Sequence, residues 1–289
     1  MDSPSTIQEF DTSASPQPLS LSVGSAWGYI GILFLITLLA GGVIAAASHD
    51  FDVKNMGTSP LKLMSYVLPF LLFGLFLKFK GELAAVFRAS ANQKQVPFLL
   101  YLLLIPLVPS IQVVLEPVTS LIPMPEMIKA WFEKELMSKS VYTILTVVVA
   151  APVLEELVFR GLLLRGMLRE YSATKAIVWS SVMFAVFHLN PWQGIGAFVV
   201  GVFMGWLFYR TRSLWVCIFF HFVNNLLSTI AVHFTPAGVD KFDSFYNQIG
   251  NATVYALIYA AALLVLIGSV FYLRRLLDTL PLKEEAAVA

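Results

Sequence analysis

Eight apolar segments recur along the chain, and each is about as long as a helix that crosses a lipid bilayer. Crossing the ~30 Å hydrocarbon core takes about 20 mostly apolar residues, and the backbone polar groups must be paired within the segment. Of the 289 residues, 58% are hydrophobic and 13% are charged, whereas soluble globular proteins carry about 25% charged residues. The sequence therefore predicts an all-α fold, a polytopic membrane helical bundle of about eight transmembrane helices. The predicted spans are 27–47, 61–79, 97–115, 141–158, 174–189, 193–209, 213–233 and 253–273.

The segments outside these spans predict how the chain is divided. Residues 1–26 are rich in Ser, Pro and Gln and contain no Lys or Arg. A secretory signal needs a basic n-region, so we interpret this stretch as a disordered polar tail. Residues 27–275 form the predicted membrane domain, with a motif core at 141–230, and residues 276–289 form a C-terminal tail. Residues 124–139 have an amphipathic pattern that predicts a helix in the membrane interface or a cap over the bundle.

The distribution of basic residues predicts the orientation of the bundle. Cytoplasmic loops of membrane proteins carry an excess of Lys and Arg. With eight spans and both termini on the cytoplasmic side, 13 of the 19 basic residues, including every arginine, fall on that side. We therefore predict an integral, multi-pass membrane protein with both termini cytoplasmic and membrane lipids as its surroundings. The formal net charge of +1 does not indicate nucleic-acid binding.

Two adjacent carboxylates, Glu155 and Glu156, follow the apolar run of the fourth span. Each charged residue at the centre of a membrane helix costs roughly 2.5–3.5 kcal/mol on the insertion scale. Glu156 precedes Arg160 by four residues, which is the spacing of an ion pair on one helical face. Glu155 lies about 100° further round the helix and lacks this partner. A structural ion pair explains Glu156 and Arg160, whereas Glu155 needs another explanation.

Two further polar clusters lie at or within later spans. His188 ends the fifth span, and His221 and Asn225 are four residues apart in the seventh, so they share one helical face. If the fourth helix continues to residue 170 before the chain turns back, Glu155 and His188 each lie about 16 residues from the turn, roughly 25 Å at 1.5 Å per residue. We therefore expect one carboxylate, two imidazoles and one amide to converge. Structural hydrogen bonding between helices is the alternative for each residue taken alone.

The three clusters resemble a known family. EELVFR fits the pattern EExxxR, FAVFH fits FxxxH and HFVNN fits HxxxN, in that order on successive membrane segments. This arrangement resembles the CPBP family, which includes the type II CAAX prenyl endopeptidases and the bacterial bacteriocin-processing and immunity proteases. The resemblance covers residues 141–230 and leaves the N-terminal third unassigned.

The resemblance implies an intramembrane endopeptidase with an all-helical core of eight spans and no cofactor. By position in the motifs, Glu155 is the general base that activates water, and His188 assists that water and carries its proton. His221 and Asn225 hold the oxyanion of the tetrahedral intermediate, and Glu156 and Arg160 support the site. The chemistry is consistent, because peptide hydrolysis needs a base near the water and donors aimed at the developing oxyanion.

Two alternatives remain open from the sequence. In the first, Glu155, His188 and His221 ligate a zinc ion that polarises the water, although the chain has no HExxH motif. In the second, the protein is a non-enzymatic transporter or immunity protein, because buried charge also marks transport paths. For the protease, the sequence predicts a peptide or membrane-protein substrate, with or without a lipid modification.

Overall fold

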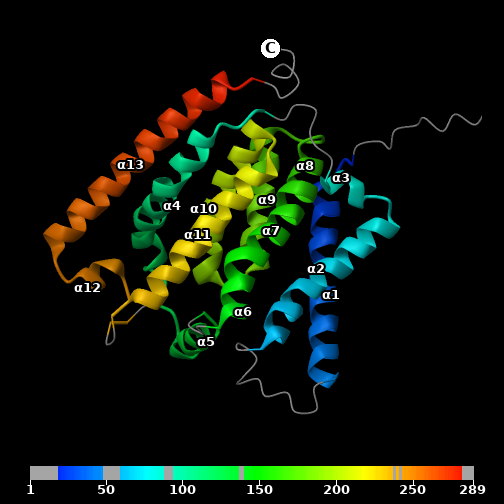
Figure 1. The fold of residues 1–289 in the computed structure, drawn as a ribbon, viewed down its shortest axis with the longest axis horizontal. Coiled ribbons are helices and arrows are strands. Elements are labelled where there is room, and N and C mark those ends of the chain that lie inside the picture. The colour runs from blue at the N-terminus through cyan, green and yellow to red at the C-terminus, as the bar shows by residue number, and fades with distance from the viewer. Residues whose placement is uncertain are drawn as a thin grey trace, which may run out of the picture.

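The computed structural model describes residues 19–47, 59–87, 94–136, 140–236, 239–240 and 243–281. Residues 1–18 of the predicted N-terminal tail and residues 282–289 of the predicted C-terminal tail lie outside the described residues. The described part of the chain is all-α, as predicted, and forms a bundle of long helices (Figure 1). Its helices are α1 (Val23–Ala47), α2 (Pro60–Phe79), α3 (Leu83–Phe87), α4 (Phe98–Thr119), α5 (Glu126–Leu136), α9 (Ala173–Phe187), α10 (Pro191–Thr211), α11 (Leu214–Phe234), α12 (Phe245–Ile249) and α13 (Ala252–Thr279).

Between α5 and α9, one continuous helix runs from Val141 to Met167 and changes its hydrogen-bonding pattern along its length. Its π-helical turns lie on both sides of the segment that carries the two glutamates. The chain turns at residues 168–172 and returns as α9, so the predicted helical hairpin is confirmed. The successive parts of the long helix are α6 (Val141–Ile144), η2 (Leu145–Ala150), α7 (Ala151–Glu156), η3 (Leu157–Leu164) and α8 (Arg165–Met167).

Seven helices in the described part of the chain are long and apolar enough to cross a membrane: α1, α2, α4, the Val141–Met167 helix, α10, α11 and α13. These seven helices are consistent with the predicted polytopic bundle of about eight transmembrane helices. The predicted span 174–189 corresponds to α9, which is apolar but only 15 residues long. At 1.5 Å per residue, a helix of this length is about 22 Å long, shorter than the ~30 Å hydrocarbon core.

Helix α1 begins before residue 27 and helix α13 ends after residue 275, the predicted limits of the membrane domain. The predicted tail 1–26 overlaps the start of α1, where Leu21 is only 3% exposed and its backbone N–H donates to the Gly166 carbonyl at 3.2 Å. At the other end, α13 continues to Thr279, and Leu277 is fully buried. Leu21 and Leu277 are therefore buried by packing against other helices, which the composition of the predicted tails does not reveal. The helix predicted within 124–139 is present as α5.

The long Val141–Met167 helix lies in the middle of the bundle, where α2, α9 and α11 pack against it. On the outer side, α13 packs against α4, and α1 packs against α2 at the opposite side (Figure 1). In Figure 1 the start of α1 and the end of α13 lie at the same end of the bundle, together with α3 and α8. The short helices α5 and α12 lie at the other end. The side chains with chemistry therefore project from central helices.

Close contact between α9 and α10 depends on two glycines. A Cβ atom at Gly201 would lie 3.2 Å from the Cβ and 3.3 Å from the Cα of Ser181, and one at Gly205 would lie 2.9 Å from Ile177 Cγ2. These distances are shorter than ordinary van der Waals contact, so only a residue without a side chain fits without displacing α9. Gly201 and Gly205, four residues apart in α10, therefore serve helix packing.

We predict that Gly201→Val separates α9 from α10 and lowers the free energy of unfolding by about 1–3 kcal/mol, as overpacked cores do. The matched variant is Gly196→Val, because a Cβ at Gly196 meets nothing within 4 Å. Both substitutions place the same side chain in the same helix. Thermal unfolding in detergent should show a large loss of stability for Gly201→Val only. Equal melting temperatures for the two variants would contradict the packing role.

Candidate active site

The two glutamates lie in the middle of the long central helix. Glu155 is 12 residues from Met167 and 14 from Val141, which corresponds to about 18–21 Å from each end. Both side chains are buried, Glu155 at 7% exposure and Glu156 at 0%. The helix is π-helical immediately before and after α7, in η2 and η3, and such turns change which way the following side chains point. Two adjacent side chains therefore both reach the bundle interior.

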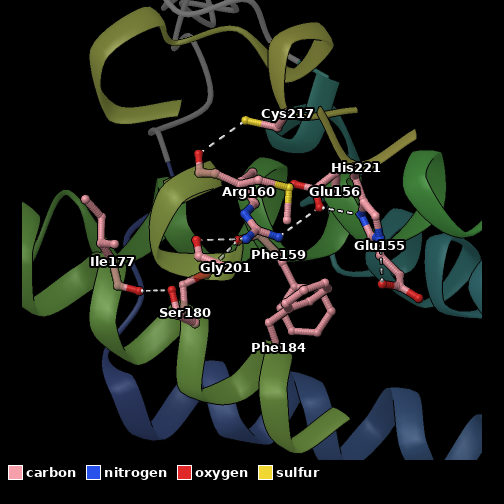
Figure 2. Close-up of polar contacts among 12 residues, drawn as sticks. Glu155, Glu156, Phe159, Arg160, Ile177, Ser180, Phe184, Gly201, Cys217 and His221 are labelled. Atoms are coloured by element: carbon pink, nitrogen blue, oxygen red, sulfur yellow. Dashed lines mark hydrogen bonds and ion pairs between the residues drawn. The ribbon is translucent and has the colours of Figure 1, made fainter. Parts of the chain in front are cut away.

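Glu156 forms a fully buried ion pair with Arg160, as the spacing of the two residues predicts. Arg160 Nη1 donates to Glu156 Oε1 at 2.9 Å, and both side chains are 0% exposed. The second guanidinium nitrogen donates to the Gly201 carbonyl at 3.1 Å, and the guanidinium lies over the Phe184 ring at 4.8 Å (Figure 2). Arg160 thus joins the central helix to α9 and α10.

His221 on α11 lies beside both glutamates. Its Nδ1 is 2.9 Å from Glu156 Oε1, and its Nε2 is 4.0 Å from Glu155 Oε2. Because an ionised carboxylate only accepts hydrogen bonds, we assign the Nδ1 proton to this contact, so Nδ1 donates to Glu156. The neutral imidazole then presents the lone pair of Nε2 towards Glu155, and the protonated imidazole presents an N–H there. Figure 2 shows Arg160, Glu156 and His221 joined in series, with Glu155 next to His221.

The two oxygens of Glu155 have different surroundings. Tyr66 on α2 donates its hydroxyl to Oε1 at 2.5 Å. Oε2 is buried and makes no hydrogen bond within the part of the chain that the structure describes. The 4.0 Å between Oε2 and His221 Nε2 is too long for a direct hydrogen bond.

His188 is the C-cap of α9, in the tight turn that leads into α10. The next residue, Leu189, has a φ of 57°, a left-handed conformation that costs a non-glycine residue about 1–2 kcal/mol. His188 Nδ1 is 2.8 Å from the Phe184 carbonyl, and its ring meets the Phe184 ring with centroids 4.9 Å apart. The Phe184 ring also meets His221, at 5.7 Å. Both imidazoles therefore pack on one aromatic ring.

Asn225 lies one turn beyond His221 on α11 and is held by a chain of amide contacts. Its Nδ2 donates to the Val147 carbonyl of η2 at 2.8 Å, and its Oδ1 accepts from Asn224 Nδ2 at 3.1 Å. Gln112 on α4 in turn donates to Asn224 Oδ1 and to Ser228 Oγ, both at 3.0 Å. An amide nitrogen carries two hydrogens, so Asn225 keeps one donor beyond the bond to Val147.

The structure therefore brings four of the six predicted site residues into one contact network: Glu155, Glu156, Arg160 and His221. His188 joins this network through Phe184. Among the described residues, neither His188 nor Asn225 hydrogen-bonds to Glu155. The catalytic roles assigned to these residues stay predictions.

Sequence reasoning missed Tyr66 and Gln112, which come from helices α2 and α4 outside the recognised motifs. A tyrosine or glutamine within an apolar span is the only signal that pointed to them. It does not say which partner helix each side chain faces.

In the zinc alternative, the side chains of Glu155, His188 and His221 would have to bind one metal ion. In the part of the chain that the structure describes, no group of three or more His, Cys, Asp or Glu side chains is arranged to hold a metal ion. His188 and His221 meet through Phe184, and only His221 lies beside Glu155.

The fold and this cluster define a class of protein: an integral, multi-pass helical membrane protein with buried carboxylates and imidazoles at the centre of its bundle. Residues 137–227, about a third of the chain, match the family model described as Type II CAAX prenyl endopeptidase Rce1-like, so this segment is similar to the family that the three motifs resemble. The match ends two residues after Asn225 and includes all three motifs. A search of the curated proteins and a search of the solved structures each found no match to the chain.

We predict that Arg160→Met lowers the free energy of unfolding by about 3–5 kcal/mol, because it leaves Glu156 as a buried charge without its cation. Thermal unfolding in detergent measures the change. The double variant Arg160→Met/Glu156→Gln should recover part of the loss, since no buried charge remains at that position.

Arg274→Met serves as the control, because Arg274 is exposed near the end of α13. It should leave the melting temperature within a few degrees of wild type. If Arg160→Met unfolded at the wild-type temperature, the pair would not stabilise the bundle.

Proposed function

We propose that the protein hydrolyses a peptide bond within the membrane with a water molecule activated by Glu155. The observation that carries the proposal is the buried Oε2 of Glu155, which has no hydrogen-bond partner among the described residues and faces His221 Nε2 at 4.0 Å. A carboxylate oxygen next to an imidazole nitrogen is a suitable place for a water that must lose a proton. The match of residues 137–227 to an endopeptidase family supports the same chemistry.

In this reaction Glu155 removes a proton from the water as the water oxygen bonds to the carbonyl carbon of the substrate peptide. A tetrahedral intermediate with a negative oxygen results. Its collapse breaks the C–N bond, and the proton held by Glu155 passes to the leaving nitrogen. The products are a carboxylic acid and an amine, and no group outside the protein and the water is consumed.

Glu156 and His221 divide the electrostatic work. Glu156 accepts from His221 Nδ1 and so fixes the orientation of the ring, as the buried aspartate of a serine-protease triad does. In the proposed reaction the imidazolium form of His221 donates from its Nε2–H to the developing oxyanion. The second amide hydrogen of Asn225 is the other proposed donor, held in place by the bond to Val147. Losing one such donor typically lowers the rate by 10²–10³-fold.

His188 has a separate proposed role in proton movement. The contact of its Nδ1 with the Phe184 carbonyl assigns the proton to Nδ1, so Nε2 accepts in the neutral form. Such a nitrogen can take a proton from the reacting water or return one to the leaving amine. The left-handed Leu189 beside it fixes the turn that carries the ring.

The proposed substrate is a peptide or membrane protein, by analogy with the name of the matching family one whose C-terminal cysteine carries a prenyl group. The lipid would lie among the apolar helices, and the adjoining peptide bond would be presented to Glu155. Farnesylated and unmodified versions of the same C-terminal peptides distinguish a lipid-dependent protease from one that reads only the polypeptide.

We predict that Glu155→Gln lowers peptide hydrolysis at least about 10²-fold, because the amide cannot accept the proton of the water. The assay uses purified protein in detergent micelles, the peptides above, and mass spectrometry of the products. Glu116→Gln is the matched control: Glu116 is a half-buried carboxylate in α4 that accepts from the backbone N–H of Phe245. It should retain wild-type activity.

The other functions considered from the sequence give different results in the same assay. If the protein were a transporter or a binding-type immunity protein, wild-type protein would cleave no peptide, and Glu155→Gln would keep the biological activity. If Glu155, His188 and His221 held zinc, elemental analysis would find about one equivalent of metal, and chelators would abolish cleavage. Wild-type cleavage that survives Glu155→Gln contradicts the proposal directly.

A further inference from the structure

Tyr66 holds a place in the site that the three motifs do not cover. It lies on α2, far in sequence from the segment 137–227 that matches the endopeptidase family. Its hydroxyl donates to Glu155 Oε1 at 2.5 Å across 89 positions of sequence. This hydrogen bond is the direct polar contact between α2 and the proposed general base.

The ring of Tyr66 is fixed by a row of aromatic contacts that runs from α2 to α9. Tyr66 packs on Phe70 with centroids 5.4 Å apart, and Phe70 meets Phe187 at 6.3 Å. Phe187 in turn meets Phe159 of the central helix at 5.5 Å. Aromatic pairs at such distances are each favourable by about 0.5–1.5 kcal/mol beyond their buried area. These contacts hold the ring of Tyr66 in place, with its hydroxyl directed at Glu155.

We propose that Tyr66 is a positioning residue, which binds one oxygen of Glu155 so that the other receives the proton of the water. The inference rests on the proposed function of Glu155. The phenol occupies one acceptor site of Oε1, whereas both acceptor sites of Oε2 are left without a donor among the described residues. Oε2 is also the oxygen nearer to His221 Nε2, so the hydrogen bond selects the oxygen that faces the second polar group of the site.

The phenol also satisfies a buried polar group. A buried carboxylate that lacks hydrogen-bond donors is costly. The guanidinium of Arg160 donates to Glu156 and to the Gly201 carbonyl. Among the described residues, Tyr66 is the one hydrogen-bond donor to Glu155. The orientation of the Glu155 side chain therefore depends on Tyr66.

A purely structural role for the pair makes different predictions. If Tyr66 and Glu155 only satisfied each other in the core, removing the hydroxyl would reduce stability and the amount of folded enzyme. The activity of each folded molecule and its response to pH would stay the same. A positioning role changes the pH dependence, because it changes the base itself.

We predict that Tyr66→Phe lowers kcat/KM about 10–100-fold, with KM within about twofold, since a small misplacement of a reacting group costs up to about 10²-fold. The phenylalanine keeps the ring that packs on Phe70. The shape of the kcat/KM profile against pH should also differ from that of the wild type, since the hydrogen bonding of the base has changed. Rates are measured between pH 5 and 9 per amount of monodisperse protein.

Tyr255→Phe is the matched control, because it also removes a hydroxyl from a glutamate within the membrane domain. The hydroxyl of Tyr255 lies 3.5 Å from Glu116 Oε2, between α13 and α4 and outside the cluster around Glu155. This variant should keep the wild-type rate and pH profile. An equal fall in kcat/KM in both tyrosine variants would mean that the loss of any hydroxyl in the bundle lowers the rate. That result would overturn the proposal.

A second pair of variants tests whether Tyr66 acts through Glu155. Glu155→Asp shortens the side chain by one methylene, roughly 1.5 Å. It therefore breaks the hydrogen bond from Tyr66 by a change in the acceptor and not in the donor. Adding Tyr66→Phe to Glu155→Asp should then change kcat/KM by less than about threefold, since the effects of coupled residues are not additive. Full additivity of the two losses would overturn the inference.

The outcomes separate this inference from the proposed function. If Glu155→Gln is inactive and Tyr66→Phe has the wild-type profile, Tyr66 is not a positioning residue and Glu155 remains the base. If Glu155→Gln is active, the proposed function fails, and the role of Tyr66 fails with it. If Tyr66→Phe yields too little folded protein, Glu155→Asp decides, because it breaks the same hydrogen bond with Tyr66 in place: a wild-type kcat/KM for Glu155→Asp would overturn the proposal.

Discussion

A positive charge without access to water lies at the centre of the bundle, and the rest of the site depends on how it is neutralised. Arg160 is fully buried, and its guanidinium contacts Glu156 of its own helix, the Gly201 carbonyl of α10 and the Phe184 ring of α9. Glu156 then accepts from His221 of α11. One ion pair therefore fixes four helix segments relative to each other, which a bilayer cannot do through a hydrophobic driving force alone. A buried ion pair is expensive to form, so its gain here is the specified arrangement and not extra stability.

This arrangement reaches the proposed chemistry through packing of the helices around it. Gly201 has two tasks at once: its missing side chain allows α9 to approach, and its carbonyl accepts from Arg160. Because α9 approaches closely, Phe184 lies over the guanidinium and also meets the rings of His188 and His221. The distance between α9 and α10 therefore influences where both imidazoles lie. Packing and function depend on the same few contacts.

The sequence predicted the features that depend on local spacing and missed those that depend on the approach of distant segments. The i, i+4 spacing of Glu156 and Arg160 predicted their ion pair, and apolar runs predicted the helices. Nothing local distinguished α9, whose apolar run looks like a span but forms a helix of only 15 residues. Leu21 was counted in a polar tail because composition does not register burial against Gly166. The same limit hid Tyr66, since its importance comes from the approach of α2 to the central helix.

The two adjacent glutamates differ in a way that separates their roles. Glu156 is enclosed by a guanidinium and an imidazole, so its charge is neutralised and its Oε1 already accepts two hydrogen bonds. Glu155 has a neutral phenol on one oxygen and a more distant imidazole on the other. Two carboxylates in such different surroundings are suited to different tasks, one to fix charge and one to exchange a proton. The change of helix type from η2 through α7 to η3 allows the adjacent side chains of Glu155 and Glu156 to reach these separate surroundings. In the proposed function, Glu156 is therefore the structural anion and Glu155 the reactive base, because each side chain has the partners that its role needs.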